Sequence, residues 1–203
     1  MRYLIAIPCM DMVHTLFMSS LLAMRRPAGT EISICQSSLV YDSRNTIAQQ
    51  AVDKGVDRVL WLDSDMVFES DLMERLIADM DEGRQFAAGL YFTRKAPIEP
   101  CFYRELQQFE SGRTKAIPYT DYPRGTIFEV AGIGFGAAMC SVEALKLAGV
   151  ESGPFSPIQG WGEDLSFAIK VREKGVKLYC DSRIIVKHIG QTLIDESTWR
   201  GKK

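Results

Sequence analysis

The sequence lacks any long apolar stretch. A helix that spans a bilayer needs about 20 consecutive apolar residues, and no segment of this 203-residue chain approaches that length. The first twelve residues carry one early arginine, Arg2, and a short apolar run that Pro8 and Asp11 interrupt. Because this start is a poor match to a secretory signal peptide, we expect a cytoplasmic protein without a membrane span.

An excess of charge of one sign is also missing. The formal net charge is only −2, from 24 Lys and Arg residues against 26 Asp and Glu residues, so the composition indicates no basic surface for nucleic acid. The cysteines show no metal-type spacing, and an odd, dispersed set favours a reducing compartment over a disulfide framework. The five are Cys9, Cys35, Cys101, Cys140 and Cys180.

The chain has no internal repeat and no low-complexity linker, and its length suits one domain with a substantial core. Through residue 92, short apolar runs at 3–7, 31–36, 59–62 and 86–92 alternate with helix-period segments at 13–24, 43–54 and 71–80. Such a βαβ series predicts an α/β fold, with an open, mostly parallel sheet flanked by helices.

The pattern changes after residue 92. Residues 97–125 are rich in proline, tyrosine and charge, and we interpret them as short strands and an extended loop that cover the sheet, a small antiparallel extension. Residues 126–140 return to β character, a helix is expected at 141–148, and another follows the acids at 163–164. Final β segments are predicted at 176–180 and 184–187.

Two carboxylates directly follow the apolar run 59–62, in Asp63-Ser64-Asp65. Strand side chains alternate, so Asp63 and Asp65 are expected on one face. Ligands bind at the carboxyl ends of strands in open α/β sheets, and a divalent cation relieves the repulsion between two such acids. A solvated turn is the alternative interpretation.

Three further groups attract attention. Asp42, Arg44 and Asn45 lie at a predicted helix start, where anions bind favourably, although exposed first-turn residues would give the same pattern. Alternate glycines at 132, 134 and 136 leave room for a ligand or another backbone. Trp161-Gly162-Glu163-Asp164 follows a Gly/Pro/Ser-rich loop, and its acids are either functional or simply partners of the helix dipole.

In this order, the elements resemble those of the GT-A-fold glycosyltransferases, specifically compact family 2-like members of microbial and viral type. The resemblance runs from Tyr3 to about Gly190 and ends with a late histidine, His188. It implies a single GT-A-like (Rossmann-like) domain over residues 1–190, with a nucleotide-binding half to about 92, an acceptor-side half from 93 and a polar tail at 191–203. One departure is Trp161, which replaces the first of two glycines that usually precede the acids.

The resemblance also implies a metal-dependent transfer from a nucleotide-diphosphate sugar, with UDP favoured over GDP, to an acceptor hydroxyl. Asp65 and His188 would hold Mn²⁺ or Mg²⁺, and Asp63 would assist at the metal or bind ribose. A structural histidine is the alternative for His188. The residues that would bind the nucleotide sugar are Pro8, Asp42, Arg44, Asn45, Asp63, Ser64, Asp65 and Arg94.

On the acceptor side, the resemblance makes Asp164 the general base of an inverting reaction, with Glu163 orienting the acceptor or supporting the loop. Trp161 would stack on a sugar, and Gly134 and Gly162 would line the same side. A retaining enzyme of the same layout remains an alternative, and the acceptor is open among a glycan, a lipid or another hydroxyl compound. The oligomeric state is not encoded in any motif.

Two other classes of function fit parts of the sequence. Asp63-Ser64-Asp65-Met66-Val67 matches the Asp-x-Asp-x-Val pattern of haloacid-dehalogenase-like phosphatases, in which Asp63 would be the nucleophile. That family places the motif on its first strand, whereas here other β segments precede it. A non-catalytic sugar-binding module is the second class, but it would not need a metal pair and a separate acid in one pocket.

Overall fold

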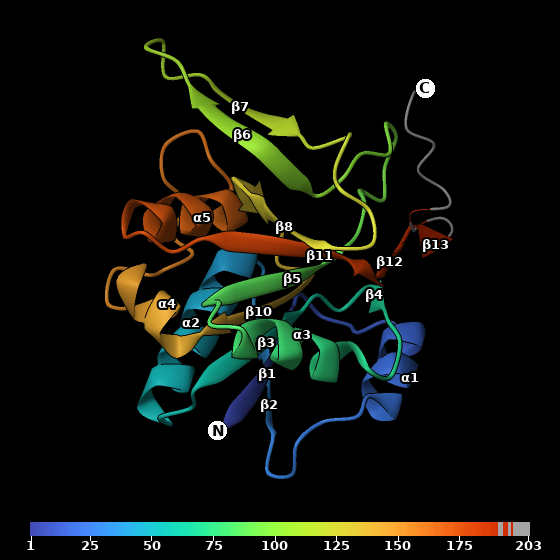
Figure 1. Cartoon of the computed structure of the whole chain (residues 1–203). Coiled ribbons are helices and arrows are strands. Elements are labelled where there is room, and N and C mark those ends of the chain that lie inside the picture. The colour runs from blue at the N-terminus through green and yellow to red at the C-terminus, as the bar shows by residue number, and fades with distance from the viewer. Residues whose placement is uncertain (191–192, 195, 197–203) are drawn as a thin grey trace.

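The computed structural model describes residues 1–190, 193–194 and 196. Its centre is a seven-stranded sheet in which five strands run in one direction, while β10 and β8 run in the other. The strand order is β2 (Glu31–Gln36), β1 (Tyr3–Cys9), β3 (Arg58–Leu62), β10 (Ala137–Ser141), β5 (Phe86–Leu90), β11 (Leu178–Ile185) and β8 (Ile127–Val130). The predicted α/β class with a mostly parallel sheet is confirmed (Figure 1).

Helices cover both faces of the sheet. One face packs against α2 (Val40–Asp53), α4 (Val142–Leu147) and α5 (Glu163–Glu173), and the other against α1 (Thr15–Ala23) and α3 (Leu72–Asp81). Side chains along β1 alternate between the two faces of the sheet. Leu4 and Ala6 belong to the core on the α2 face, and Ile5 and Ile7 belong to the core on the α1 face. Each fully buried aliphatic side chain contributes about 1.5–3 kcal/mol to this packing.

Two small antiparallel sheets extend the fold. One contains β4 (Met66–Val67), β12 (Lys187–Ile189) and β13 (Leu193–Ile194), so it joins the segment after β3 to the end of the chain. The other contains β6 (Phe102–Gln108), β7 (Thr114–Pro118) and β9 (Gly132–Ile133), and its β6–β7 hairpin projects away from the main sheet (Figure 1). Thr114 Oγ1 donates to the carbonyl of Gly160 at 2.5 Å, which ties the hairpin to the loop before α5.

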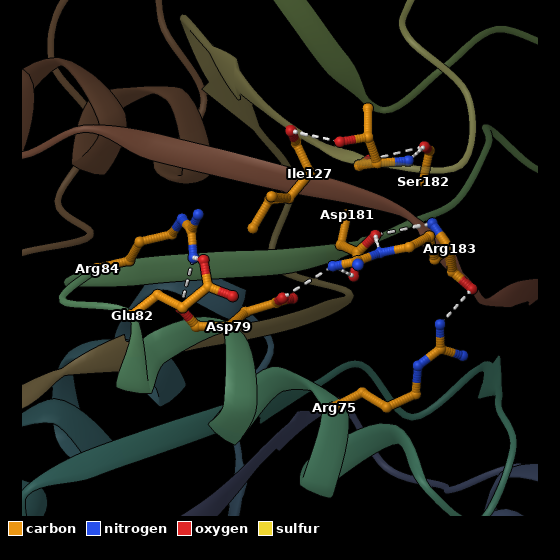
Figure 2. A network of polar contacts seen from close by, with 9 residues as sticks. Arg75, Asp79, Glu82, Arg84, Ile127, Asp181, Ser182 and Arg183 are labelled. Atoms are coloured by element: carbon orange, nitrogen blue, oxygen red, sulfur yellow. Dashed lines mark hydrogen bonds and ion pairs between the residues drawn. The ribbon is translucent and has the colours of Figure 1, made fainter.

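A polar network joins α3 to β11 on the face opposite α2 (Figure 2). Arg183 donates from Nε to Asp181 Oδ1 at 2.8 Å and from Nη2 to Asp79 Oδ1 at 3.2 Å. Arg75 donates to the carbonyl of Arg183, and Arg84 donates to the carbonyl of Asp79, both at 2.8 Å. The network therefore connects side chains and backbone of both elements.

Several local expectations differ from the structure. The helix expected to begin at Ser43 begins at Val40, because Ser37 Oγ accepts from the backbone of Leu39 and starts the turn earlier, and Ser43 is buried inside α2. The two final β segments are one continuous strand, β11, which is followed by β12 with His188 inside it.

All five cysteines lie in the described part of the chain, and none is disulfide-bonded. Most of the predicted tail at 191–203 lies outside the described residues, although Leu193–Ile194 pair with β12. Among the residues that the structure describes, no helix has the length and apolarity that crossing a membrane requires.

Candidate functional site

A cleft of about 720 Å³ opens at the carboxyl ends of β1 and β3. The loop after β1, the first turn of α2, the Asp63–Asp65 segment, the start of α5 and β12 bound it. Two guanidinium groups line it, those of Arg44 and Arg94, against five carboxylates, those of Asp11, Asp63, Asp65, Glu163 and Asp164. These seven groups alone give the lining a formal net charge of −3.

Arg44 is the cation at the base of this cleft. Its side chain is only 1% exposed, and it contacts three carboxylates that are each 23–28% exposed. Nη2 donates to Asp63 Oδ1 at 2.8 Å, while Nη1 forms ion pairs with Asp164 Oδ1 and, at 3.5 Å, with Glu163 Oε1. One buried guanidinium therefore links the acid at the end of β3 to both acids at the start of α5.

Aromatic rings enclose the same arginine. The guanidinium carbon lies 5.4 Å from the ring centre of Phe135 and 5.8 Å from that of Phe155, distances at which a cation is attracted to an aromatic face. The backbone N–H of Phe135 also donates to Asp164 Oδ2 at 3.3 Å. The Asp164 carboxylate is consequently held at both oxygens, whereas Glu163 is held by one long contact.

Asp65 forms a second cluster on the other side of Ser64. Its Oδ2 atom lies 3.3 Å from Nε2 of His188 and is also paired with Nη1 of Arg94. Nδ1 of His188 lies 2.9 Å from the carbonyl of Phe92, so Nδ1 carries a proton there and Nε2 is turned toward Asp65. β4 and β12 make this approach possible, because His188 is paired with Met66 in their ladder.

The environment of Asp65 favours its ionised form. Burial raises the pKa of the carboxyl group, but the hydrogen bond and charge of His188 and the charge of Arg94 outweigh burial and lower the pKa below its usual value. The group is therefore a carboxylate throughout the neutral pH range, as a cation ligand must be.

Tyr91 fills the space left by two of the alternate glycines, Gly134 and Gly136. A Cβ atom at Gly134 would stand 2.0 Å from the Tyr91 hydroxyl, and one at Gly136 would stand 2.3 Å from Met66 Cε and 3.0 Å from the Tyr91 ring. The backbone N–H of Gly136 donates to the same hydroxyl at 3.1 Å. Burial raises the pKa of the phenol well above its usual value, so this ring is a neutral support beneath the cleft.

No model of a known protein family matches the chain, and no curated protein matches it in sequence. Solved structures do match it. The structure of A197 from STIV superposes with a TM-score of 0.68 over 93% of this chain and 86% of that one, at 22% identity. The structure of GalNAc-T7 with UDP, GalNAc and Mn²⁺ superposes with a TM-score of 0.65 at 15% identity. The fold is GT-A. This chain is covered completely in the second comparison but spans only 45% of the GalNAc-T7 chain.

The GT-A resemblance implies a divalent cation, and the residues at Asp65 can be tested for fit. Adjacent ligands in an octahedral shell, each about 2.1 Å from the ion, lie about 3 Å apart, and Asp65 Oδ2 and His188 Nε2 are 3.3 Å apart. A carboxylate with an imidazole fixed by a carbonyl is a typical donor set. The pair fits such an ion, with other positions left for water and phosphate oxygens.

Asp63 does not complete a three-residue ligand set. Among the described residues, no group of three or more His, Cys, Asp or Glu side chains is arranged to hold a metal ion. Asp63 is instead engaged by Arg44, whose Nη2 donates to Asp63 Oδ1 at 2.8 Å. The two acids of the motif therefore have different partners, a buried arginine for Asp63 and the histidine for Asp65.

The cleft brings together most of the predicted site residues but not all of them. Pro8, Arg44, Asp63, Ser64, Asp65, Arg94, Glu163, Asp164 and His188 line it. Asp42 is exposed on α2 outside the lining, and Asn45 binds Ser156 Oγ at 3.1 Å and the N–H of Phe155 at 2.8 Å. Asn45 thus holds the loop before α5.

The acceptor-side residues Gly134, Trp161 and Gly162 also lie outside the cleft lining. Gly134 is buried beneath Tyr91, and Trp161 is 7% exposed. Gly162 is the N-cap of α5, and its carbonyl accepts from the backbone and hydroxyl of Ser166. Gly162 thus caps the helix that begins with Glu163 and Asp164.

Several residues in or beneath the cleft were not predicted, and two of them, His14 and Tyr91, make hydrogen bonds that shape it. His14 lies in the wall and caps α1, with Nδ1 accepting from the N–H of Leu16 at 3.2 Å, and its backbone N–H donates to the carbonyl of Ser64 at 3.0 Å. Its position in the loop after the first strand was the available signal. Tyr91 had no signal, because a tyrosine at the end of an apolar strand is ordinary core.

Proposed function

We propose that the protein is a glycosyltransferase that moves a sugar from a nucleotide-diphosphate sugar to an acceptor hydroxyl, with a divalent cation, Mn²⁺ or Mg²⁺. The observation that carries this proposal is the cleft of a GT-A fold in which Asp65 and His188 face each other and Arg44 links Asp63 to Glu163 and Asp164. We further propose that residues 1–190 form one domain, with the donor half to about residue 92 and the acceptor half after it.

The charge of the cleft supports cation dependence. A nucleotide diphosphate is an anion, and it would enter a lining that already carries a net charge of −3. Asp65 and His188 would hold a divalent cation against the diphosphate, where the cation stabilises the leaving group as a Lewis acid. Pro8, Ser64 and Arg94 lie in the same wall, and we assign them to the donor. UDP is favoured over GDP as the nucleotide.

Asp164 is the proposed base for an inverting reaction. The acceptor hydroxyl must lose a proton as it attacks the anomeric carbon, and a positioned carboxylate typically contributes about 10²–10⁴-fold in rate. Arg44 and the N–H of Phe135 orient the Asp164 side chain from behind while it stays 26% exposed. Glu163, with one long contact, is free to orient the acceptor. A retaining reaction with Asp164 as an acceptor-positioning residue is the alternative.

A donor panel tests the function. The protein is incubated with UDP- and GDP-sugars, with and without Mn²⁺, and release of the nucleotide diphosphate is measured alongside hydrolysis of phosphate monoesters. Mn²⁺-dependent release from at least one donor is expected. Donor binding with no release would instead indicate a sugar-binding module.

Phosphatase activity is the outcome that contradicts the proposal most directly. The Asp-x-Asp-x-Val pattern follows β3, the third strand of the chain, and the fold is GT-A. Asp63, which would be the phosphatase nucleophile, is engaged by Arg44. Both features favour the transferase.

A further inference from the structure

Two cationic side chains lie in the cleft, and they are held in opposite ways. Arg44 is 1% exposed, with three carboxylates and two aromatic rings around it. The Arg94 side chain is 50% exposed, and among the described residues Asp65 is its single partner. Arg44 is therefore a fixed part of the fold, whereas Arg94 can leave its partner without disturbing the core.

Arg94 contacts the same oxygen that faces the histidine. Nη1 of Arg94 and Nε2 of His188 both approach Oδ2 of Asp65. A divalent cation held between Oδ2 and Nε2 would therefore bind to an oxygen that Arg94 already contacts. Two positive charges cannot share one carboxylate oxygen at contact distance without strong repulsion.

The backbone that carries Arg94 is anchored next to it. The N–H of Thr93 donates to the carbonyl of Glu99 at 2.9 Å, and Thr93 Oγ1 donates to the carbonyl of Pro97 at 3.1 Å. The N–H of Glu99 donates to Thr93 Oγ1 at 3.0 Å. Because these bonds close the base of the loop, the movable part is the long arginine side chain.

We propose that Arg94 is a displaceable counter-ion. It neutralises Asp65 when no donor is bound, and it transfers to the donor diphosphate when the divalent cation binds to Asp65 and His188. The inference rests on the proposed function and adds a regulation of that site. The cation and the diphosphate then bind cooperatively, because an anion that attracts Arg94 removes the competitor for Asp65, and this coupling is reciprocal.

Removing Arg94 from the site should strengthen the binding of one ligand, the metal ion, and weaken the binding of the other, the diphosphate. Arg94→Met should bind Mn²⁺ alone about two- to five-fold more tightly than the natural chain, the range that a half-exposed ion pair allows. The same variant should bind UDP at saturating Mn²⁺ about ten-fold more weakly, because charge-assisted contacts to the diphosphate are lost.

The experiment is a pair of calorimetric titrations on the full chain, Mn²⁺ alone and UDP at saturating Mn²⁺. Lys95→Met is the matched control, since it removes a neighbouring exposed positive charge whose side chain contacts no carboxylate among the described residues. The Mn²⁺ affinity of Lys95→Met should stay within about 1.5-fold of that of the natural chain. This control separates the loss of the contact with Asp65 from a general change in the electrostatic potential of the cleft.

Each result decides the matter. Tighter Mn²⁺ binding with weaker UDP binding in Arg94→Met alone supports the exchange. Unchanged or weaker Mn²⁺ binding in a folded Arg94→Met protein overturns it while leaving metal dependence intact. Equal gains in both variants overturn it in favour of a general charge effect. Absence of Mn²⁺ binding in the natural chain would overturn the metal-dependent function itself, and the exchange with it.

Discussion

Two arginine–carboxylate clusters lie on opposite faces of the central sheet, and their burial is inverted. Around Arg44 the cation is 1% exposed, and the three acids reach the cleft. Around Arg183 the cation is 46% exposed, while the side chains of Asp79 and Asp181 are 5% and 2% exposed. In the Arg44 cluster the cation is buried, so the carboxylates remain accessible to a ligand. In the Arg183 cluster the carboxylates are buried, so their contacts only join α3 to β11.

The burial of the two acids beside Arg183 also affects their protonation. Burial, the charge of Asp181 and a hydrogen bond with it raise the pKa of Asp79 to about 6, despite the opposing charges of Arg183 and Arg84. The buried Oδ2 atom of Asp79 accepts no hydrogen bond from a donor group among the described residues, and such an environment favours the protonated carboxyl group. We interpret the Arg183 cluster as structural and the Arg44 cluster as functional.

The largest expected effect is on the rate of transfer. Asp164→Asn keeps the size of the side chain but removes the proposed base, so transfer should fall about 10²–10⁴-fold while donor affinity is largely kept. Asp65→Ala should lose both donor binding and transfer. Transfer rates and UDP titrations with Mn²⁺ separate the two variants.

Product stereochemistry is the companion measurement. Inversion at the anomeric carbon, followed by NMR, together with an inactive Asp164→Asn protein, supports the base. Retention would make Asp164 an acceptor-positioning residue.

The next effect is on stability. Arg44→Met leaves three carboxylates without their shared cation and should cost about 3 kcal/mol, because removing one partner of a buried ion pair strands the other charges. Arg183→Met leaves two buried carboxyl groups, but Asp79 can take up a proton there, so the loss should be smaller, about 1 kcal/mol. Urea unfolding at pH 7 gives both values, and equal losses would remove the distinction between the clusters.

Metal affinity should respond to the histidine. His188→Ala removes the imidazole that faces Asp65, and even residues that only support metal ligands typically contribute about 10–100-fold. Mn²⁺ titration should therefore weaken at least about 10-fold, with His14→Ala as the matched control. An unchanged titration would identify His188 as structural.

The last expected effect concerns pH. Because the pKa of Asp79 is raised in the folded protein, the folded state binds more protons than the unfolded chain between about pH 4 and pH 6. The stability contributed by this group is present below about pH 4 and is lost as pH rises through about 6. Asp79→Asn should raise the stability at pH 7 by about 2 kcal/mol and flatten the pH dependence over this window.

The control for that variant is Asp42→Asn, whose exposed side chain has no partner among the described residues. Its unfolding free energy should follow that of the natural chain at each pH. Thermal unfolding of the three proteins from pH 4 to 8 makes the comparison, and parallel curves for all three would show that Asp79 titrates normally.

Local sequence signals predicted the fold and the polar groups at the carboxyl end of β3 well. The apolar run of β3 ends in two acids, and alternation along an extended chain was enough to expect a polar group at the carboxyl end of the sheet. The link from Asp65 to His188 came only from the order of elements in a known family. Nothing in the local sequence around either residue indicates it.

Contacts distant in sequence explain what was missed. Arg44 and Asn45 are adjacent at the start of a helix, yet the first contacts the cleft acids and the second holds the loop before α5. Local periodicity could not distinguish them, because their partners lie up to 119 residues away. The alternate glycines correctly indicated a close approach, but the approaching group is Tyr91.

The fit of Tyr91 against Gly134 and Gly136 also constrains how such a chain can evolve. Neither glycine has a positive φ angle, so their backbone would accept other residues, and only the phenol and the Met66 side chain exclude a Cβ there. Single substitutions at either glycine should therefore be rejected while Tyr91 is present and become tolerable once it is smaller. Among homologous sequences, we expect these three positions to covary, with larger residues between β9 and β10 wherever the tyrosine is lost.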